Sequence, residues 1–185
     1  MKKKLTLGFL TLALTFTLAA CSEENSQQGT DHTEHENMDH STMNHSSHED
    51  VPEGLAEATN PTFPLGTTAI MHAHHMPGMD GVKATIVGAY NTTAYEVTYT
   101  STTTGELVKN HKWVVHEELE NPGTAPLKQG TEITLSADHM EGMDGATAVI
   151  DSAEKTTVYL VDYTSSTGEK VTNHKWVTES ELATE

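Results

Sequence analysis

Apolar residues spaced two apart recur in several short stretches of the chain beyond residue 65. Each stretch contributes three of them: Ala69, Met71 and Ala73; Val82, Ala84 and Ile86; Tyr95, Val97 and Tyr99. This spacing puts the apolar side chains on one face of an extended chain, so it predicts half-buried β-strands. A turn at Thr104-Gly105 then leads to a last predicted strand that carries the sequence Asn-His-Lys-Trp-Val.

The same pattern occurs a second time. The segment HHMPGMDGVKATI is matched 64 residues later by DHMEGMDGATAVI, and TGELVKNHKWV is matched by TGEKVTNHKWV. We assign residues 65–120 to a first repeat β-domain, 121–129 to a Pro- and Gly-containing linker and 130–185 to a second repeat β-domain. Four or more short strands in about 55 residues predict an all-β fold of two tandem small SH3-like β-barrels or rolls.

The N-terminal residues have the pattern of a secretion signal. Three lysines precede an apolar run from Leu5 to Ala20, which is shorter than a membrane-spanning helix requires. The run ends in LAAC, which looks like a bacterial lipobox, and Cys21 is the chain's single cysteine. Residues 1–20 are therefore predicted to be a lipoprotein signal peptide, and Cys21 to carry a lipid that anchors the protein at the extracellular face of the cell membrane. The alternative is an ordinary signal peptide with a chance cysteine.

Residues 21–64 are poor in apolar side chains, so we expect a disordered tether. The tether is rich in imidazole and thioether groups, which alternate with carboxylates and need no fold to bind metal: His32, His35, Met38, His40, Met43, His45 and His48. Two interpretations are compatible here. The segment is a solubilising spacer, or it is an accessory metal-collecting tail, which the composition favours.

Charge narrows the choice of partners. The chain carries 27 acidic and 10 basic residues, and removal of the signal would leave a net charge of about −20. Such a protein repels nucleic acid and anionic lipid headgroups and attracts cations. One cysteine also excludes a metal site built from several thiolates.

The repeated motifs supply candidate metal ligands. In the first repeat these are His75, Met76, Met79, His111 and Trp113, and in the second they are His139, Met140, Met143, His174 and Trp176. Thioethers select Cu(I), and by similarity Ag(I), over hard ions, whereas imidazole alone would suit Zn(II) or Cu(II) equally well. The indoles would cap the ion by a cation–π contact. His72 and His74 correspond to Ser136 and Asp138 in the second repeat, which are not imidazoles, so these two histidines are accessory candidates.

Each of these residues also has a structural interpretation. Methionines fill irregular gaps in cores, and tryptophan in a small barrel is usually a core residue. The recurrence of His-Met-x-Gly-Met together with Asn-His-Lys-Trp in both repeats favours metal binding. Because a barrel brings its first and last strands together, we expect two similar sites, each built within one repeat.

The two HHMPGMDG-type motifs, the two NHKWV segments, the lipobox and the His-rich tail together resemble the YdhK-like lipoproteins, a two-repeat family that includes copper-tolerance lipoproteins of the CopL type. The resemblance implies copper binding at the outer face of the membrane. We expect a non-enzymatic protein that binds Cu(I), with Cu(II) held through the tail, for buffering, tolerance or hand-over to an exporter or oxidase. A copper oxidase is disfavoured because the single cysteine is assigned to the lipid anchor, which leaves none for a blue-copper centre. A structural or cell-wall-binding lipoprotein without a metal is the remaining alternative.

Overall fold

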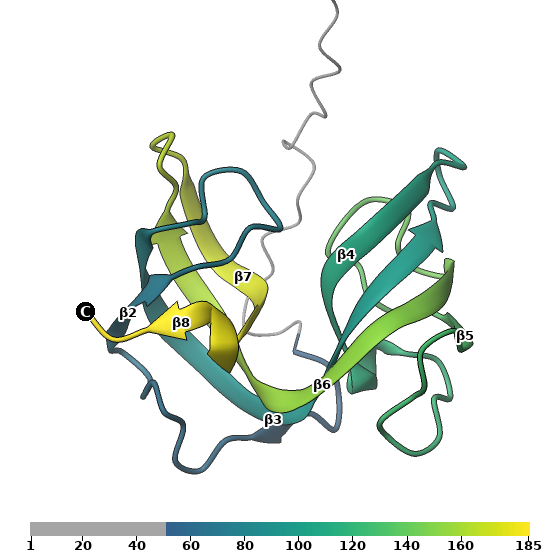
Figure 1. Ribbon diagram of the computed structural model, residues 1–185, viewed down its shortest axis with the longest axis horizontal. Helices are drawn as coiled ribbons and strands as arrows, with labels where there is room; N and C mark the ends of the chain where they lie inside the picture. The colour runs from purple at the N-terminus through teal and green to yellow at the C-terminus, as the bar shows by residue number, and fades with distance from the viewer. Residues whose placement is uncertain (1–50) are drawn as a thin grey trace, which may run out of the picture. The chain divides into compact units, whose positions relative to one another are not determined.

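The structure, a computed structural model, describes residues 51–185 (Figure 1). The predicted signal peptide, Cys21 and the tail histidines and methionines lie outside these residues. The described part is all-β, as predicted. Its strands are β1 (Ala56–Glu57), β2 (Thr68–Met71), β3 (Val82–Thr100), β4 (Leu107–Val115), β5 (Glu132–Thr134), β6 (Thr147–Thr164), β7 (Lys170–Thr178) and β8 (Leu182–Ala183), with 3₁₀ turns η3 (His116–Glu118) and η4 (Glu179–Glu181).

The end of the predicted tether belongs to the fold. Within residues 51–64, β1 pairs with the middle of β3, and Phe63 is buried with its ring edge against Tyr159. Apolar contacts of this kind fix a segment whose composition alone predicts disorder. The expectation of a disordered segment up to residue 64 is therefore wrong from residue 51 onward.

Two long strands form the backbone of the fold. β3 and β6 pair antiparallel from Ala84 opposite Tyr163 to Tyr99 opposite Ala148. These two end pairs are equivalent residues of the two repeats, so the pairing has an approximate twofold axis, which passes close to the pair Thr92 and Thr156. The strands predicted around Ala84 and around Val97 are two ends of one strand. The residues between them include Tyr, Thr and Val, which favour extended backbone, and all except Val87, which lies at a register shift, have a partner on β6.

Because β3 and β6 are continuous, each half of the fold contains strands from both repeats. The first half of β3 and the second half of β6 form a small roll with β2, β7 and β8, which we call lobe A. The second half of β3 and the first half of β6 form lobe B with β4 and β5. Figure 1 shows the two long strands curving upward at both ends, with β7 on one side and β4 on the other. Each lobe thus takes strands from both repeats, and two separate one-repeat domains do not form.

The His-Met loops confirm this exchange. The loop after β2 contacts the β6–β7 turn, where the Ser166 N–H donates to the Gly78 carbonyl at 3.0 Å. The loop after β5 contacts the β3–β4 turn in the same way, with the Thr102 N–H donating to the Gly142 carbonyl at 3.0 Å. Gly78 and Gly142 have positive φ values of 78° and 80°. Each loop is therefore fixed against a turn of the other repeat.

Replacement of Gly142 tests this contact between repeats. An alanine Cβ at Gly142 would lie 3.2 Å from the backbone N of Thr103, whereas one at Gly145 meets nothing within 4 Å. Both glycines have positive φ, which costs alanine about 1–2 kcal/mol at either position. We expect Gly142→Ala to lower the free energy of unfolding by at least about 1 kcal/mol more than Gly145→Ala, measured by urea denaturation. Equal losses would contradict the contact.

Candidate metal sites

Two histidines from different repeats meet in lobe A. His75, in the loop after β2, places Nε2 3.2 Å from Nε2 of His174 on β7. The rings stack with centroids 5.4 Å apart and planes 15° from parallel. Two imidazole nitrogens bound to one tetrahedral ion would lie about 3.3 Å apart if each bond were 2.0–2.1 Å long. The spacing of this pair therefore fits a shared ion.

An equivalent pair lies in lobe B. The ring of His111 on β4 is 6.0 Å, centroid to centroid, from that of His139 in the loop after β5. Within residues 51–185, His111 Nε2, His139 Nδ1 and His75 Nδ1 are buried without a hydrogen-bond partner. Buried polar atoms nearly always have partners, so these nitrogens need an explanation. A lone pair held for a metal ion provides one for His111 Nε2 and His139 Nδ1, whereas His75 Nδ1 faces Glu181 at 3.7 Å.

The pairing of the histidines corrects the expectation of sites built within one repeat. That expectation grouped His75 with His111 and His139 with His174. The structure instead brings His75 to His174 and His111 to His139. The reason is that β3 does not fold back after Ile86, but continues into lobe B and carries β4 there.

The asparagine of the Asn-His-Lys-Trp motif aims the histidine. Asn110 and Asn173 have positive φ values of 55° and 51°, a region that asparagine tolerates better than most residues. The register of β4 on β3 and of β7 on β6 is interrupted on both sides of His111 and His174. Irregularities of this type re-aim side chains beside functional sites. The peptide bonds Lys112–Trp113 and Lys175–Trp176, which follow, are both cis.

One methionine of each motif accompanies its pair. Met76 is half-buried against the lobe A core, and its Sδ accepts a hydrogen bond of 4.0 Å from the hydroxyl of Tyr163, whose ring packs edge-on against His174. Met140 is half-buried in the equivalent place on lobe B, where Tyr99 packs edge-on against His111. We call His75, His174 and Met76 site A, and His111, His139 and Met140 site B.

The second methionine of each motif lies deeper. Met79 and Met143 are fully buried, and their described contacts are with the apolar cores of lobes A and B. This is the structural role that methionine plays in irregular cores. Their assignment as ligands stays a prediction.

Each tryptophan is buried in a cluster between the lobes. Lys112 Nζ lies 4.9 Å from the ring centroid of Trp113, and Lys175 Nζ lies 5.9 Å from that of Trp176. One face of each indole is therefore already covered by an ammonium group. The predicted indole cap on a metal ion would need the opposite face, and it stays a prediction.

Two carboxylates of the sites were missed by the sequence interpretation. Glu118 Oε1 accepts a hydrogen bond from His139 Nε2 at 2.7 Å, and Glu181 Oε1 lies 3.7 Å from His75 Nδ1. The signal was present, since Glu118-Leu119 and Glu181-Leu182 occupy the same place in the two repeats. They were overlooked because acidic residues are common throughout this chain.

Burial and nearby charge set the protonation of site B. Burial, and then the charges of His139 and His75, lower the pKa of His111 to about 3. Burial alone would raise the pKa of Glu118, but the charge and hydrogen bond of His139 and the Val115 N–H bring it below its usual value. His111 is therefore a neutral imidazole at physiological pH, the form that binds metals.

The accessory residues of the first motif lie at the surface. His72 Nδ1 is 3.2 Å from Asp80 Oδ1 and His74 Nε2 is 3.9 Å from the same oxygen, and all three side chains are more than half exposed. Within residues 51–185, no three His, Cys, Asp or Glu side chains gather closely enough to hold a metal ion. A site in the folded part would therefore depend on thioether donors as well as imidazoles.

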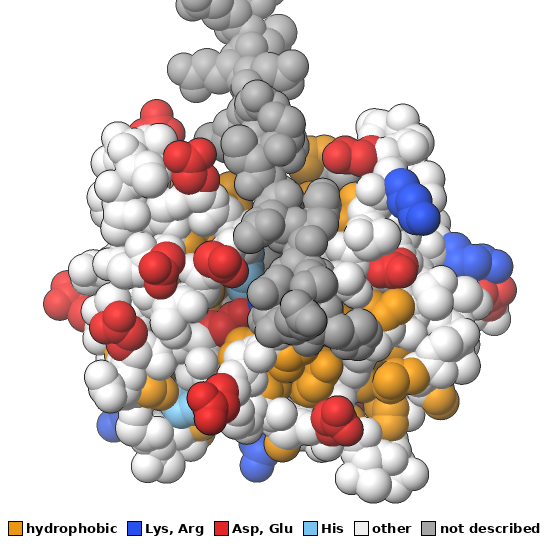
Figure 2. All heavy atoms as spheres, turned by 180° about the vertical axis from the view of Figure 1, so that it is seen from behind, with side chains coloured by type: hydrophobic (Ala, Val, Ile, Leu, Met, Phe, Trp, Pro, Cys, Tyr) orange, Lys and Arg blue, Asp and Glu red, His pale blue; other side chains and the backbone are white. Residues whose placement is uncertain are grey.

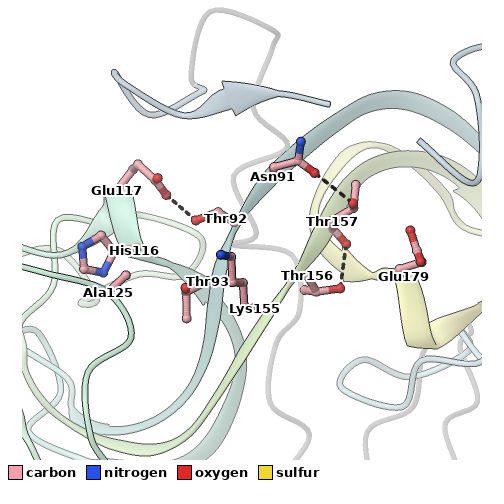
Figure 3. Close-up of a pocket in the computed structure, with 10 residues that line it drawn as sticks. All are labelled: Asn91, Thr92, Thr93, His116, Glu117, Ala125, Lys155, Thr156, Thr157 and Glu179. Atoms are coloured by element: carbon pink, nitrogen blue, oxygen red, sulfur yellow. Dashed lines mark hydrogen bonds between the residues drawn. The ribbon is translucent and has the colours of Figure 1, made fainter. Parts of the chain in front are cut away.

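A hollow of about 590 Å³ lies over the middle of β3 and β6, where the twofold axis passes (Figure 3). Threonines of both strands and Lys155 line it, between His116 and Glu117 on one side and Glu179 on the other. Its side chains partly satisfy one another, as in the 2.6 Å hydrogen bond from Thr92 to Glu117. The hollow offers hydroxyl, amide and ammonium groups among the side chains that line it.

The fold and sites define a class of protein: a two-repeat β-protein in which each site draws on both repeats. The family model described as "Protein of unknown function (DUF1541)" matches residues 65–116 and 129–179, close to the two predicted repeats. The chain belongs to this family.

Within residues 51–185, no helix has the length and apolar character needed to cross a membrane.

Its similarity to known proteins extends over most of the chain. The uncharacterized protein YdhK of Bacillus subtilis (strain 168) is 53% identical over 182 residues, which cover 97% of this chain and 89% of YdhK. A 2.00 Å crystal structure of YdhK covers 76% of this chain and 97% of its own, with 57% identity and a TM-score of 0.72. A solution NMR structure of the YdhK C-terminal domain covers 66% and 93%, with 57% identity and a TM-score of 0.62.

The lowered pKa of His111 predicts how stability depends on pH. Below pH 6.5 the unfolded chain protonates this residue while the folded protein does not until about pH 3, so stability falls as pH is lowered. The metal-free protein should lose up to about 1.4 kcal/mol of unfolding free energy per pH unit between pH 6 and 5 through His111. His111→Gln should flatten this slope in urea titrations with a chelator present. An unchanged slope would show that His111 titrates normally in the folded state.

Proposed function

We propose that the protein binds two Cu(I) ions, one at site A and one at site B. The observation that carries the proposal is the meeting of His75 with His174, whose Nε2 atoms lie 3.2 Å apart. The thioether of Met76 accepts a hydrogen bond from Tyr163, whose ring packs against His174. Two imidazoles and a thioether form a soft donor set that favours Cu(I) over Mg, Ca or Mn. The equivalent residues of site B repeat it in the other lobe.

The surroundings of the sites support a soft, monovalent ion. Within residues 51–185, no third His, Cys, Asp or Glu joins either histidine pair to form a group that could hold a metal ion, whereas zinc sites commonly complete their four ligands with such residues. The imidazole of His111, neutral at normal pH because burial lowers its pKa, binds a metal ion without a competing proton. The acidic surface, which Figure 2 shows spread over one face, attracts cations to the protein.

The role that we propose is copper buffering outside the cytoplasm. The lipobox predicts a lipid anchor at Cys21, and the His- and Met-rich tail would collect copper next to the folded sites. The bound ion would be kept from redox chemistry or passed to an exporter or oxidase. Sites without a thiol suit this location, because cysteine oxidises readily outside the cell.

Pairs of histidine substitutions test the proposal. Residues 51–185, titrated anaerobically with Cu(I) against a competing chelator, should bind two ions. His75→Ala with His174→Ala removes both imidazoles of one site, so one ion should still bind. His75→Ala with His111→Ala damages both sites, so high-affinity binding should be lost altogether.

The two double variants separate the possible outcomes. If the loss patterns are reversed, each site is built within one repeat and the pairing is wrong. If the unsubstituted protein binds no Cu(I), the folded part is not a copper protein.

The two methionines of the first motif serve as matched probes. Met76→Leu deletes the half-buried thioether, and because even outer-shell changes at metal sites cost 10–100-fold, we expect the Cu(I) affinity of site A to fall at least about tenfold. Met79→Leu alters a fully buried core side chain, so it should cost less than about 1.5 kcal/mol of stability and leave affinity intact. A loss of affinity in Met79→Leu alone would instead make Met79 the ligand.

A second candidate function rests on the hollow shown in Figure 3. Its threonine hydroxyls, the Asn91 amide and the Lys155 ammonium suit a hydroxylated ligand such as a cell-wall glycan. This function needs none of the histidine pairs. Glycan binding that survives His75→Ala with His111→Ala would therefore support it independently of copper.

A further inference from the structure

Two carboxylates, of which Glu118 is buried and Glu181 half-buried, lie beside the histidine pairs. Glu118 is 3% exposed and accepts the 2.7 Å hydrogen bond from His139 Nε2, which leaves His139 Nδ1 as the unpartnered ring nitrogen. Glu181 stands in the equivalent position near His75. A metal-ligating histidine usually presents its second nitrogen to such a group, which fixes the orientation of the ring. Glu118 and Glu181 therefore occupy the place of orienting carboxylates.

Each carboxylate is held from two directions. One hydrogen bond comes from a backbone N–H at the start of its own 3₁₀ turn, and the other comes from an indole N–H. Glu118 Oε2 accepts from the Val115 N–H at 3.0 Å and from Trp176 Nε1 at 3.0 Å, and Glu181 Oε2 accepts from the Thr178 N–H at 3.0 Å and from Trp113 Nε1 at 2.8 Å. Charge-assisted hydrogen bonds of this kind are stronger than neutral ones. The carboxylates are thus rigid supports.

The indole bonds cross between the sites. Trp176 follows the site A ligand His174 by two residues on β7, yet it holds Glu118, which supports His139 of site B. Trp113 follows the site B ligand His111 on β4 and holds Glu181, beside His75 of site A. Each site therefore contains a strand that supports the carboxylate of the other.

We propose that Glu118 and Glu181 are positioning residues of the two sites, and that the crossed indole bonds couple the sites so that an ion bound at one raises the affinity of the other. This inference rests on the proposed function. An ion on His174 restrains β7 and Trp176, and so restrains Glu118 and the ring of His139 before site B is filled. The second ion then has less conformational entropy to overcome, which gives positive cooperativity.

The two tryptophans report on the two supporting carboxylates. The chain has only two, so the full-length protein should give two indole N–H signals in a ¹H–¹⁵N NMR spectrum, that of Trp113 beside Glu181 and that of Trp176 beside Glu118. Ag(I) is diamagnetic and stands in for Cu(I). Ag(I) is titrated at a fixed excess of a competing ligand. The His- and Met-rich tail is present in every variant, so any competition from it for Ag(I) is the same throughout.

The first variant changes the support of one site. Glu118→Gln keeps the size of the side chain but loses the charge. We expect the Ag(I) midpoint of the Trp176 signal to rise 10–100-fold, the range for outer-shell partners. Glu181→Gln should do the same to the Trp113 signal. A midpoint that stays within twofold in both variants would overturn the positioning role.

The second variant tests the coupling. Trp113→Phe keeps an aromatic ring but removes the N–H that holds Glu181, and it changes no residue of site B. We expect the midpoint of the Trp176 signal to rise fivefold or more, since coupling typically spans 5–150-fold. Val158→Ala is the matched control, because it loosens the same buried cluster without touching either carboxylate. It should leave the midpoint unchanged at a comparable loss of thermal stability.

The outcomes separate this inference from the proposed function. If neither indole signal of the unsubstituted protein responds to Ag(I), the metal sites themselves are wrong. If both respond, but Trp113→Phe leaves the Trp176 midpoint unchanged, or Val158→Ala shifts it equally, the sites exist and the coupling does not.

Discussion

The antiparallel pairing of β3 with β6 is the constraint on which the rest of the structure depends. It runs from one lobe to the other and follows an approximate twofold axis, so equivalent residues of the two repeats occupy equivalent places. Because both strands continue through the middle, β4 belongs to lobe B and β7 to lobe A, each opposite the His-Met loop of the other repeat. Without this pairing, neither histidine pair would form.

Much of the fold and part of the candidate sites could be predicted from the sequence. The period-two pattern around Ala84 and Val97 identified strand segments, and the recurrence of His-Met and Asn-His-Lys-Trp identified the metal-binding candidates. Periodicity does not state which strand pairs with which, and Gly88 and Asn91 resemble turn residues although both lie inside β3. The choice of partner depends on long-range pairing, so the prediction grouped the histidines with the wrong partners. Glu118 and Glu181 were not recognised from the sequence, because acidic residues are abundant throughout this chain.

The two sites combine imidazole groups with hydrogen-bonded carboxylates on an acidic protein. Their imidazoles are buried and, at His111, kept neutral by burial and by neighbouring histidines. The negative charge beside the sites comes from the carboxylates of Glu118 and Glu181. Both carboxylates already accept hydrogen bonds from backbone and indole N–H groups. A thioether completes each set of donors under the proposed function. Under the proposed function, the overall charge gathers cations while the donors select a soft ion, so attraction and selectivity come from different parts of the molecule.

The central claim is that each copper site is shared between the repeats. Anomalous diffraction from crystals of the protein loaded with Ag(I) tests it most directly, because it locates each ion and identifies its ligands. We predict two ions, one between His75 and His174 and one between His111 and His139, with Met76 and Met140 as the sulfur ligands. A single ion, or ions held by His75 with His111 and by His139 with His174, would contradict the account.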